Sequence, residues 1–220
     1  EKYPKLKEKT DRLLASSNLI MWYAKNPCIK HDKLKPYPIG PKWQWKTTRF
    51  YGENKFQHMQ IYNSFGTNPD KLFRDKSLKQ NLLFFNFSQT TNNPLYTPHK
   101  NCRHKVKSES LKNGFTWNNN TAFKDYMDVL KTYKFALAPP GRGIDTHRCW
   151  EALMVGTIPI VLSSSINELY EGLPVVVVED WSIITEEFLD KKYDEILKST
   201  YDFRKVYCDY WVQKITGNNS

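Results

Sequence analysis

The residues best suited to chemistry in this 220-residue chain lie close together near its middle. A glycine-rich turn contains Gly141, Arg142 and Gly143, and Arg148 and Glu151 follow it at helical spacing. Backbone N–H groups in such a turn and at a helix start bind anions, and guanidinium groups make paired hydrogen bonds to phosphate oxygens. The Glu151 carboxylate, three residues beyond Arg148, has two possible roles, to bind a ribose diol or to pair with Arg148. The pattern predicts a site for a phosphate-bearing ligand.

The segments on either side of this turn predict two parallel strands. Phe135–Ala138 is a short apolar run typical of a buried strand, and Pro139–Gly143 is a loop that no regular element can traverse. Ile158–Leu162 is predicted to be the next strand. With a helix between them, the two strands form a βαβ unit with a parallel pair.

The intervening helix is predicted to begin at Asp145, whose side chain is a good N-cap. Trp150, Leu153 and Met154 supply its apolar stripe, and Gly156 is expected to end it. The first-turn amides then face the glycine turn.

A further strand and a polar loop precede this unit. Asn81–Ser88 is a continuous apolar run of the kind that parallel sheets bury, and Gln89–Pro94 is a polar loop at its carboxyl end. Such loops line the ligand crevice of open α/β sheets. Ser88 and Asn92 are therefore either ligand contacts or parts of an ordinary turn.

The whole pattern predicts an α/β protein with a Rossmann-like parallel sheet flanked by helices. Val175–Val178 is expected to add a strand, and Ala122–Leu130, Ile183–Leu197 and Tyr201–Ile215 to be helices. Phe115–Trp117 is predicted to be a short strand. The formal net charge of +10 favours anionic partners, but a lysine-rich solvated surface explains it better than any one such partner.

Several enzyme classes do not fit these residues. A nicotinamide dehydrogenase needs a third glycine and an acid after the next strand, where Thr146 and Ser163 stand instead. The P-loop motif of NTPases is absent, and so is the Asp-x-Asp triplet of metal-dependent transferases. The four cysteines lack the spacing of a zinc site or a disulfide framework, and no metal site is expected.

The segment Lys134–Arg148, together with Trp150–Leu153 and Gly156–Val161, resembles the donor-binding signature of exostosin-like glycosyltransferases. The resemblance extends over roughly residues 80 to 190, with a weaker likeness at Asn26-Pro27 and Lys33–Gly40. It implies a GT-B fold and transfer of a sugar, with inversion and without an essential metal. The implied donor is a nucleotide-diphosphate sugar, expected to be a UDP-sugar such as UDP-xylose or a UDP-hexose. The implied acceptor is a glycan hydroxyl. The implied donor-binding residues are Gly141, Arg142, Gly143, Asp145, Thr146, His147, Arg148 and Glu151, joined by Ser88 and Asn92.

In such a fold the chain divides into three parts. Residues 1–79 are expected to be a partial, acceptor-side region with a linker, so the N-terminal half is truncated. Residues 80–200 form the nucleotide-sugar-binding domain, and 201–220 a helix that crosses back. Inversion needs a general base, for which His31 and Asp32 are the candidates by placement.

The alternative to a transferase is a non-catalytic module that binds an anionic glycan or nucleic acid; for the transferase, no nucleic-acid partner is expected. No transmembrane segment is predicted. Unpaired cysteines, and a sequon at Asn86 inside a predicted core strand, favour the cytoplasm over the Golgi lumen. The free use of asparagine and lysine resembles that of glycosyltransferases encoded by large DNA viruses, which extends the expected location to the cytoplasm of an infected cell.

Overall fold

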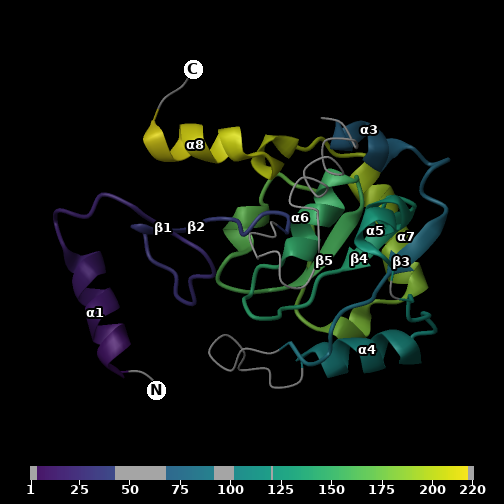
Figure 1. Ribbon diagram of the computed structural model, residues 1–220, viewed down its shortest axis with the longest axis horizontal. Coiled ribbons are helices and arrows are strands. Elements are labelled where there is room, and N and C mark those ends of the chain that lie inside the picture. Colours follow the sequence, from purple (N-terminus) through teal and green to yellow (C-terminus); the bar gives the residue numbers. More distant parts are fainter. Residues whose placement is uncertain (1–3, 43–67, 92–101, 120, 218–220) are drawn as a thin grey trace.

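The computed structural model describes residues 4–42, 68–91, 102–119 and 121–217 (Figure 1). It is an α/β protein with a four-stranded sheet, all of whose strands are parallel, in the order β3-β4-β5-β6. The strands are β3 (Asn81–Phe84), β4 (Tyr133–Leu137), β5 (Ile158–Leu162) and β6 (Val176–Val178). The predicted βαβ unit is confirmed, since β4 and β5 pair in parallel on either side of helix α6 (His147–Met154).

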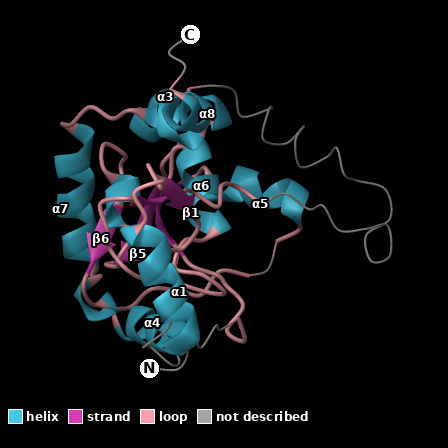
Figure 2. Cartoon of the chain, turned by 90° about the vertical axis from the view of Figure 1, so that its left-hand side faces the viewer, coloured by secondary structure: helices cyan, strands magenta, loops and turns pink. Residues whose placement is uncertain are grey.

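Helices cover both faces of this sheet (Figure 2). Because side chains alternate along a strand, Phe135 and Leu137 point into the larger core while Ala136 between them points into the smaller one. The larger core includes residues of α7 (Glu186–Leu197), and the Phe135 and Tyr193 rings meet edge to face at 6.0 Å. The smaller core lies against α5 (Phe123–Leu130) and one side of α6. The predicted Rossmann-like layering of helices on a parallel sheet is therefore present.

Helix α6 has the apolar stripe that its sequence predicts. Trp150 and Leu153 are buried, and Met154 is half-buried. Gly156 follows the helix with a φ of 65°, a left-handed conformation that glycine adopts at no steric cost.

The N-terminal part stands beside the main sheet (Figure 1). It contains α1 (Pro4–Ala15) and a separate two-stranded parallel sheet of β1 (Trp22–Ala24) and β2 (Leu34–Pro36). The apolar run Leu19–Ala24 predicts a strand over its whole length, but β1 covers only Trp22–Ala24, and Ile20 is 88% exposed. An apolar run alone could not distinguish this surface position from a core strand.

The remaining elements complete the main body. The expected strand at Phe115–Trp117 is wrong: the segment is irregular, and Trp117 packs its ring edge to face on Phe85 and Phe87. The last helix reaches the N-terminal part, where Trp211 meets Tyr37 at 5.7 Å. The other helices are α3 (Pro69–Arg74), α4 (Cys102–Lys112) and α8 (Cys208–Thr216), and the 3-10 turns are η1 (Asn167–Tyr170), η2 (Trp181–Ile183) and η3 (Phe203–Val206).

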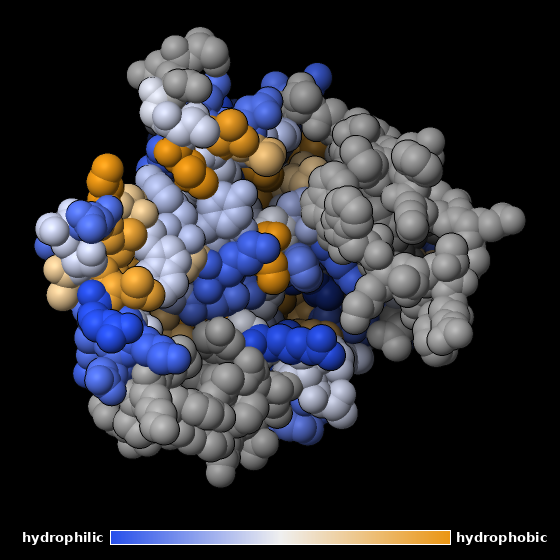
Figure 3. Space-filling view, turned by 60° about the vertical axis from the view of Figure 1, so that its left-hand side comes forward, coloured by the Kyte–Doolittle hydropathy of each residue, from blue (hydrophilic) through white to orange (hydrophobic). Residues whose placement is uncertain are grey.

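On the face drawn in Figure 3, the described residues are mostly hydrophilic, with small separate apolar groups among them. The exposed apolar residues of the N-terminal part and of α8 are Leu13, Ile20, Met21, Ile29, Val212 and Ile215. Among the helices that the structure describes, none has the length and apolar character needed to cross a bilayer.

Candidate anion-binding site at the start of helix α6

The glycine loop and the first turn of α6 lie where β4 ends. Since the strands are parallel, the loops after β3, β4, β5 and β6 leave the sheet at one edge, which is where open α/β sheets bind ligands. The backbone places Arg148 in the first turn of α6, as its sequence position predicted.

Asp145 does not cap the helix, and that prediction is wrong. Thr146 occupies the N-cap position, and its side chain makes no capping hydrogen bond. The Asp145 carboxylate is instead 2% exposed and accepts from Trp150 Nε1 at 2.9 Å and from the backbone N–H of Ile39 at 2.7 Å. Burial raises the pKa of Asp145 to about 6, against the lowering effect of these hydrogen bonds. Its function is to join the segment after β2 to α6.

The segment after β2 lies along the first half of α6 through three contacts. Besides the Ile39 bond, the Gly40 carbonyl oxygen lies 2.8 Å from His147 Nδ1, and the Lys42 N–H donates to Glu151 Oε1 at 3.3 Å. Asp145, His147 and Glu151 are all predicted ligand contacts. The structure shows that all three side chains bind residues 39–42, a contact across more than a hundred positions that no local pattern reveals.

Glu151 is 5% exposed. Its carboxylate does not pair with Arg148 Nε or Nη1, the two buried nitrogens of the guanidinium group. Its second oxygen accepts from the Tyr126 hydroxyl at 3.1 Å. The predicted ion pair between Glu151 and Arg148 is therefore not formed through Nε or Nη1. Binding of a ribose diol stays a prediction.

The two loop glycines make room for side chains from distant elements. A Cβ atom on Gly141 would lie 2.5 Å from Arg103 Nη2, and one on Gly143 would lie 2.5 Å from Asn26 Nδ2. Arg103 donates to the Ser88, Pro139 and Pro140 carbonyl oxygens at 2.8, 3.3 and 2.9 Å. It thereby fastens the loop after β4 to the chain beyond β3.

Asn26 closes the loop from the other side. It has a φ of 52°, a conformation that asparagine tolerates better than most residues, and its Oδ1 accepts from the Asp145 N–H at 2.6 Å. The Asp145 N–H, one of the amides predicted to bind a phosphate, therefore donates to a protein side chain instead. Asn26 and Arg103 were not predicted as site residues; the Asn-Pro pair at 26–27 was the only local signal.

Arg148 differs from these neighbours because two nitrogens of its guanidinium group have no acceptor in the part of the chain that the structure describes. Its central carbon lies 5.1 Å from the centre of the Phe84 ring and 5.0 Å from that of Tyr126. Nε and Nη1 are buried and have no hydrogen-bond partner among residues 4–42, 68–91, 102–119 and 121–217, and neither does the buried Thr146 hydroxyl two positions earlier. The cation thus lies over two adjoining aromatic rings, whose centres are 6.0 Å apart, and two of its donors are unused.

The other predicted residues fall outside this cluster. Arg142 is exposed, and the Ser88 hydroxyl is exposed and lies 3.1 Å from that of Thr90. Asn92 lies outside the described residues. His31 and Asp32 belong to the turn between β1 and β2 and line a separate cavity. Within the described residues, Thr146 and Arg148 therefore keep unpaired donors, whereas Asp145, His147 and Glu151 have protein partners.

The fold and this site define an α/β protein with a parallel, Rossmann-like sheet and a half-buried arginine at its carboxyl edge. No protein-family model and no curated protein sequence matches the chain.

Proposed function

We propose that this protein is an inverting glycosyltransferase that binds the diphosphate of a nucleotide sugar, expected to be a UDP-sugar, at the start of α6. The main sheet then corresponds to the donor-binding half of a GT-B enzyme of the exostosin-like kind. The single observation that supports the proposal most is the pair of buried, unpaired donors on Arg148.

Such donors are costly when they remain unsatisfied. A buried polar group without a hydrogen bond costs about 1–3 kcal/mol, and more when the group is charged. Native proteins keep few of them, and an unexplained one indicates a ligand, an ion or a catalytic role. Arg148 lies at the positive end of the α6 dipole, where an anion is further stabilised. A diphosphate supplies both the charge and the acceptor oxygens.

The Arg148 guanidinium also suits the chemistry of an inverting sugar transfer. In an inverting transfer, the acceptor oxygen attacks the anomeric carbon while the bond from that carbon to the phosphate oxygen breaks and leaves its electron pair on the diphosphate. Arg148, with Thr146 and the exposed Arg142 as further donors, stabilises that growing charge. A carboxylate or imidazole, Asp32 or His31, takes the acceptor's proton.

A nucleotide panel tests the donor site. We expect UDP to raise the melting temperature, because a ligand that binds only the folded state stabilises it by about 2.7 kcal/mol at 100 times its Kd. The shift should persist in EDTA, since the proposed grip on the diphosphate uses protein donors. Thermal unfolding with UDP, GDP, ADP and inorganic phosphate measures it. An unchanged melting temperature with every nucleotide would refute the donor site. A response to acidic polymers alone would favour the binding-module alternative.

A further inference from the structure

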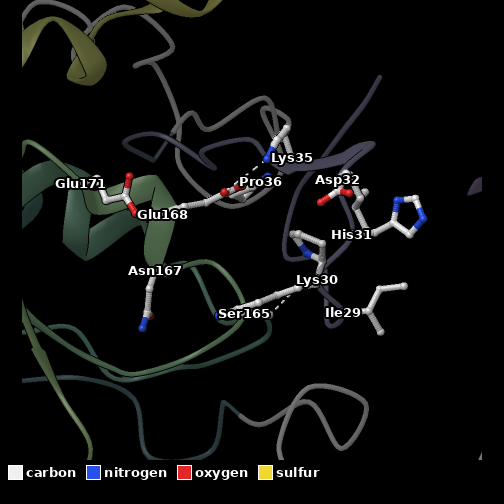
Figure 4. A pocket seen from close by; sticks show the side chains of 12 residues that line it. Ile29, Lys30, His31, Asp32, Lys35, Pro36, Ser165, Asn167, Glu168 and Glu171 are labelled. Atoms are coloured by element: carbon white, nitrogen blue, oxygen red, sulfur yellow. Dashed lines mark hydrogen bonds and ion pairs between the residues drawn. The ribbon is translucent and has the colours of Figure 1, made fainter. Parts of the chain in front are cut away.

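The cavity lined by His31 and Asp32 lies between the N-terminal part and the chain that follows β5. It has a volume of about 300 Å³, at the small end of the range for small-molecule sites. One wall is the β1–β2 turn and strand β2, and the other is the stretch from Ser165 through η1 (Figure 4). The polar side chains that line it include Lys30, Asp32, Lys35, Ser165, Glu168 and Glu171.

Two contacts join the walls. The Ser165 hydroxyl donates to the Pro27 carbonyl oxygen at 2.5 Å, and Lys35 Nζ lies 3.5 Å from Glu168 Oε2 (Figure 4). Ser165 belongs to the loop after β5 and Pro27 to the loop after β1. The cavity is therefore held at the same carboxyl edge of the main sheet as the start of α6.

The cavity also adjoins the glycine loop. Pro27 lines it, and the preceding residue, Asn26, contacts Gly143 and accepts from the Asp145 N–H. Since adjacent Cα atoms are about 3.8 Å apart, the cavity and the loop are separated at this point by one residue. The cavity therefore adjoins the glycine loop that leads into α6.

The lining differs in charge from the chain as a whole. It carries three carboxylates and two ammonium groups, and Lys205, just outside, donates to the Glu171 carbonyl oxygen. The lining charges sum to −1, and Lys205 outside the lining brings the sum to zero, whereas the whole chain carries +10. Alternating donors and acceptors suit sugar hydroxyls, which both donate and accept. Pro27, Ile29 and Pro36 add apolar surface for the C–H face of a ring.

We propose that this cavity binds the sugar acceptor, that this acceptor is uncharged, and that Asp32 is its general base. The inference rests on the proposed function above. In Figure 4 the Asp32 carboxylate points toward the Glu168 wall, whereas the His31 ring points away from the other lining residues. His31 Nδ1 moreover accepts from the Lys33 N–H at 3.1 Å. Asp32 takes the hydroxyl proton while the acceptor oxygen bonds to the anomeric carbon and the diphosphate leaves with its electron pair.

Saturation-transfer NMR on the whole chain tests the cavity with three probes: methyl β-xyloside, methyl β-galactoside and methyl β-glucuronide. At about 10 mM, which populates millimolar sites, we expect signals from the two neutral glycosides and a weaker one from the glucuronide. Glu171→Gln should weaken neutral binding roughly 10-fold, since it removes a charged acceptor. Asp11→Asn, an exposed carboxylate of α1 paired with Lys7, is the matched control and should change nothing.

Three results would overturn the inference: a stronger glucuronide signal, equal signals in wild type and Glu171→Gln, or no signal from either neutral glycoside. UDP binding, measured on the same samples, separates this from the proposed function. Asp32→Asn should keep the UDP-induced shift and lose transfer. Glycoside binding without any nucleotide binding would leave the cavity standing as a sugar site and refute the donor site.

Discussion

Replacing Arg148 by methionine is expected to abolish nucleotide binding without lowering the stability of the ligand-free protein. The substitution removes two buried donors that have no partner among the described residues, and it keeps a long apolar side chain over the adjoining rings of Phe84 and Tyr126. Loss of charge-assisted hydrogen bonds to phosphate costs about 1.5–3 kcal/mol each. Two such bonds correspond to roughly a 100-fold or greater loss of UDP affinity. Calorimetry with UDP and thermal unfolding without it measure the two effects.

Arg148→Lys is the control that separates charge from geometry. Lysine keeps the positive charge but not the planar fork, so we expect partial recovery of UDP binding. The proposed role of Arg148 in nucleotide binding is contradicted if the methionine variant binds UDP as the wild type does. It is also contradicted if the ligand-free methionine variant unfolds several degrees earlier, because Arg148 would then be a residue that the fold requires.

Replacing Gly156 by alanine is expected to destabilise the fold by about 3 kcal/mol or more. The residue has a φ of 65°, and a Cβ atom would lie 2.4 Å from the Phe73 backbone nitrogen and 2.8 Å from the Leu72 carbonyl carbon. Backbone atoms cannot rotate away as a side chain can, so α3 must move and withdraw the fully buried Phe73 from the core. In a chain of this length such a loss lowers the melting temperature by roughly 6–12 °C.

Gly172→Ala provides the matched comparison. Gly172 has a φ of 76°, but a Cβ atom there would meet nothing within 4 Å. Its substitution adds only the strain of a left-handed alanine, about 1–2 kcal/mol. Denaturant unfolding of both variants at an unchanged m-value measures the difference. Equal losses would show that α3 does not pack against Gly156 as described.

The parallel sheet could be predicted because its signals are local. Ile158–Leu162 and the run from Asn81 are apolar segments of strand length, and Gly156 separates a helical stripe from the next strand. Each of these depends on neighbours in the chain. The βαβ unit then follows from connection rules rather than from distant contacts.

The partners of the site residues could not be predicted, because they come from far along the chain. Asp145 looks like an N-cap in sequence, yet the Ile39 N–H and the Trp150 indole bind its carboxylate. Gly141 and Gly143 look like phosphate-binding glycines, yet each admits a side chain, from Arg103 and Asn26. Glycine and aspartate patterns show where a special backbone lies but not what fills the space around it.

For Arg148, the position could be predicted from the sequence but the hydrogen bonding could not. Its position in the first turn of α6 could be predicted from spacing, but its unpaired state depends on where Glu151 points. Glu151 binds Tyr126 and residue 42 instead of the guanidinium. Two guanidinium N–H groups thereby remain available to a ligand. These N–H groups support a nucleotide-sugar site more strongly than the glycine loop does.

Transfer of a sugar tests the central proposal most directly. The protein is incubated with a panel of UDP- and GDP-sugars, with and without the neutral glycoside acceptors, and UDP release and the anomeric configuration of the product are followed by NMR. We expect one UDP-sugar to give acceptor-dependent UDP release and an inverted linkage, both lost in Arg148→Met. Absence of release with every donor, or a product of retained configuration, would contradict an inverting glycosyltransferase.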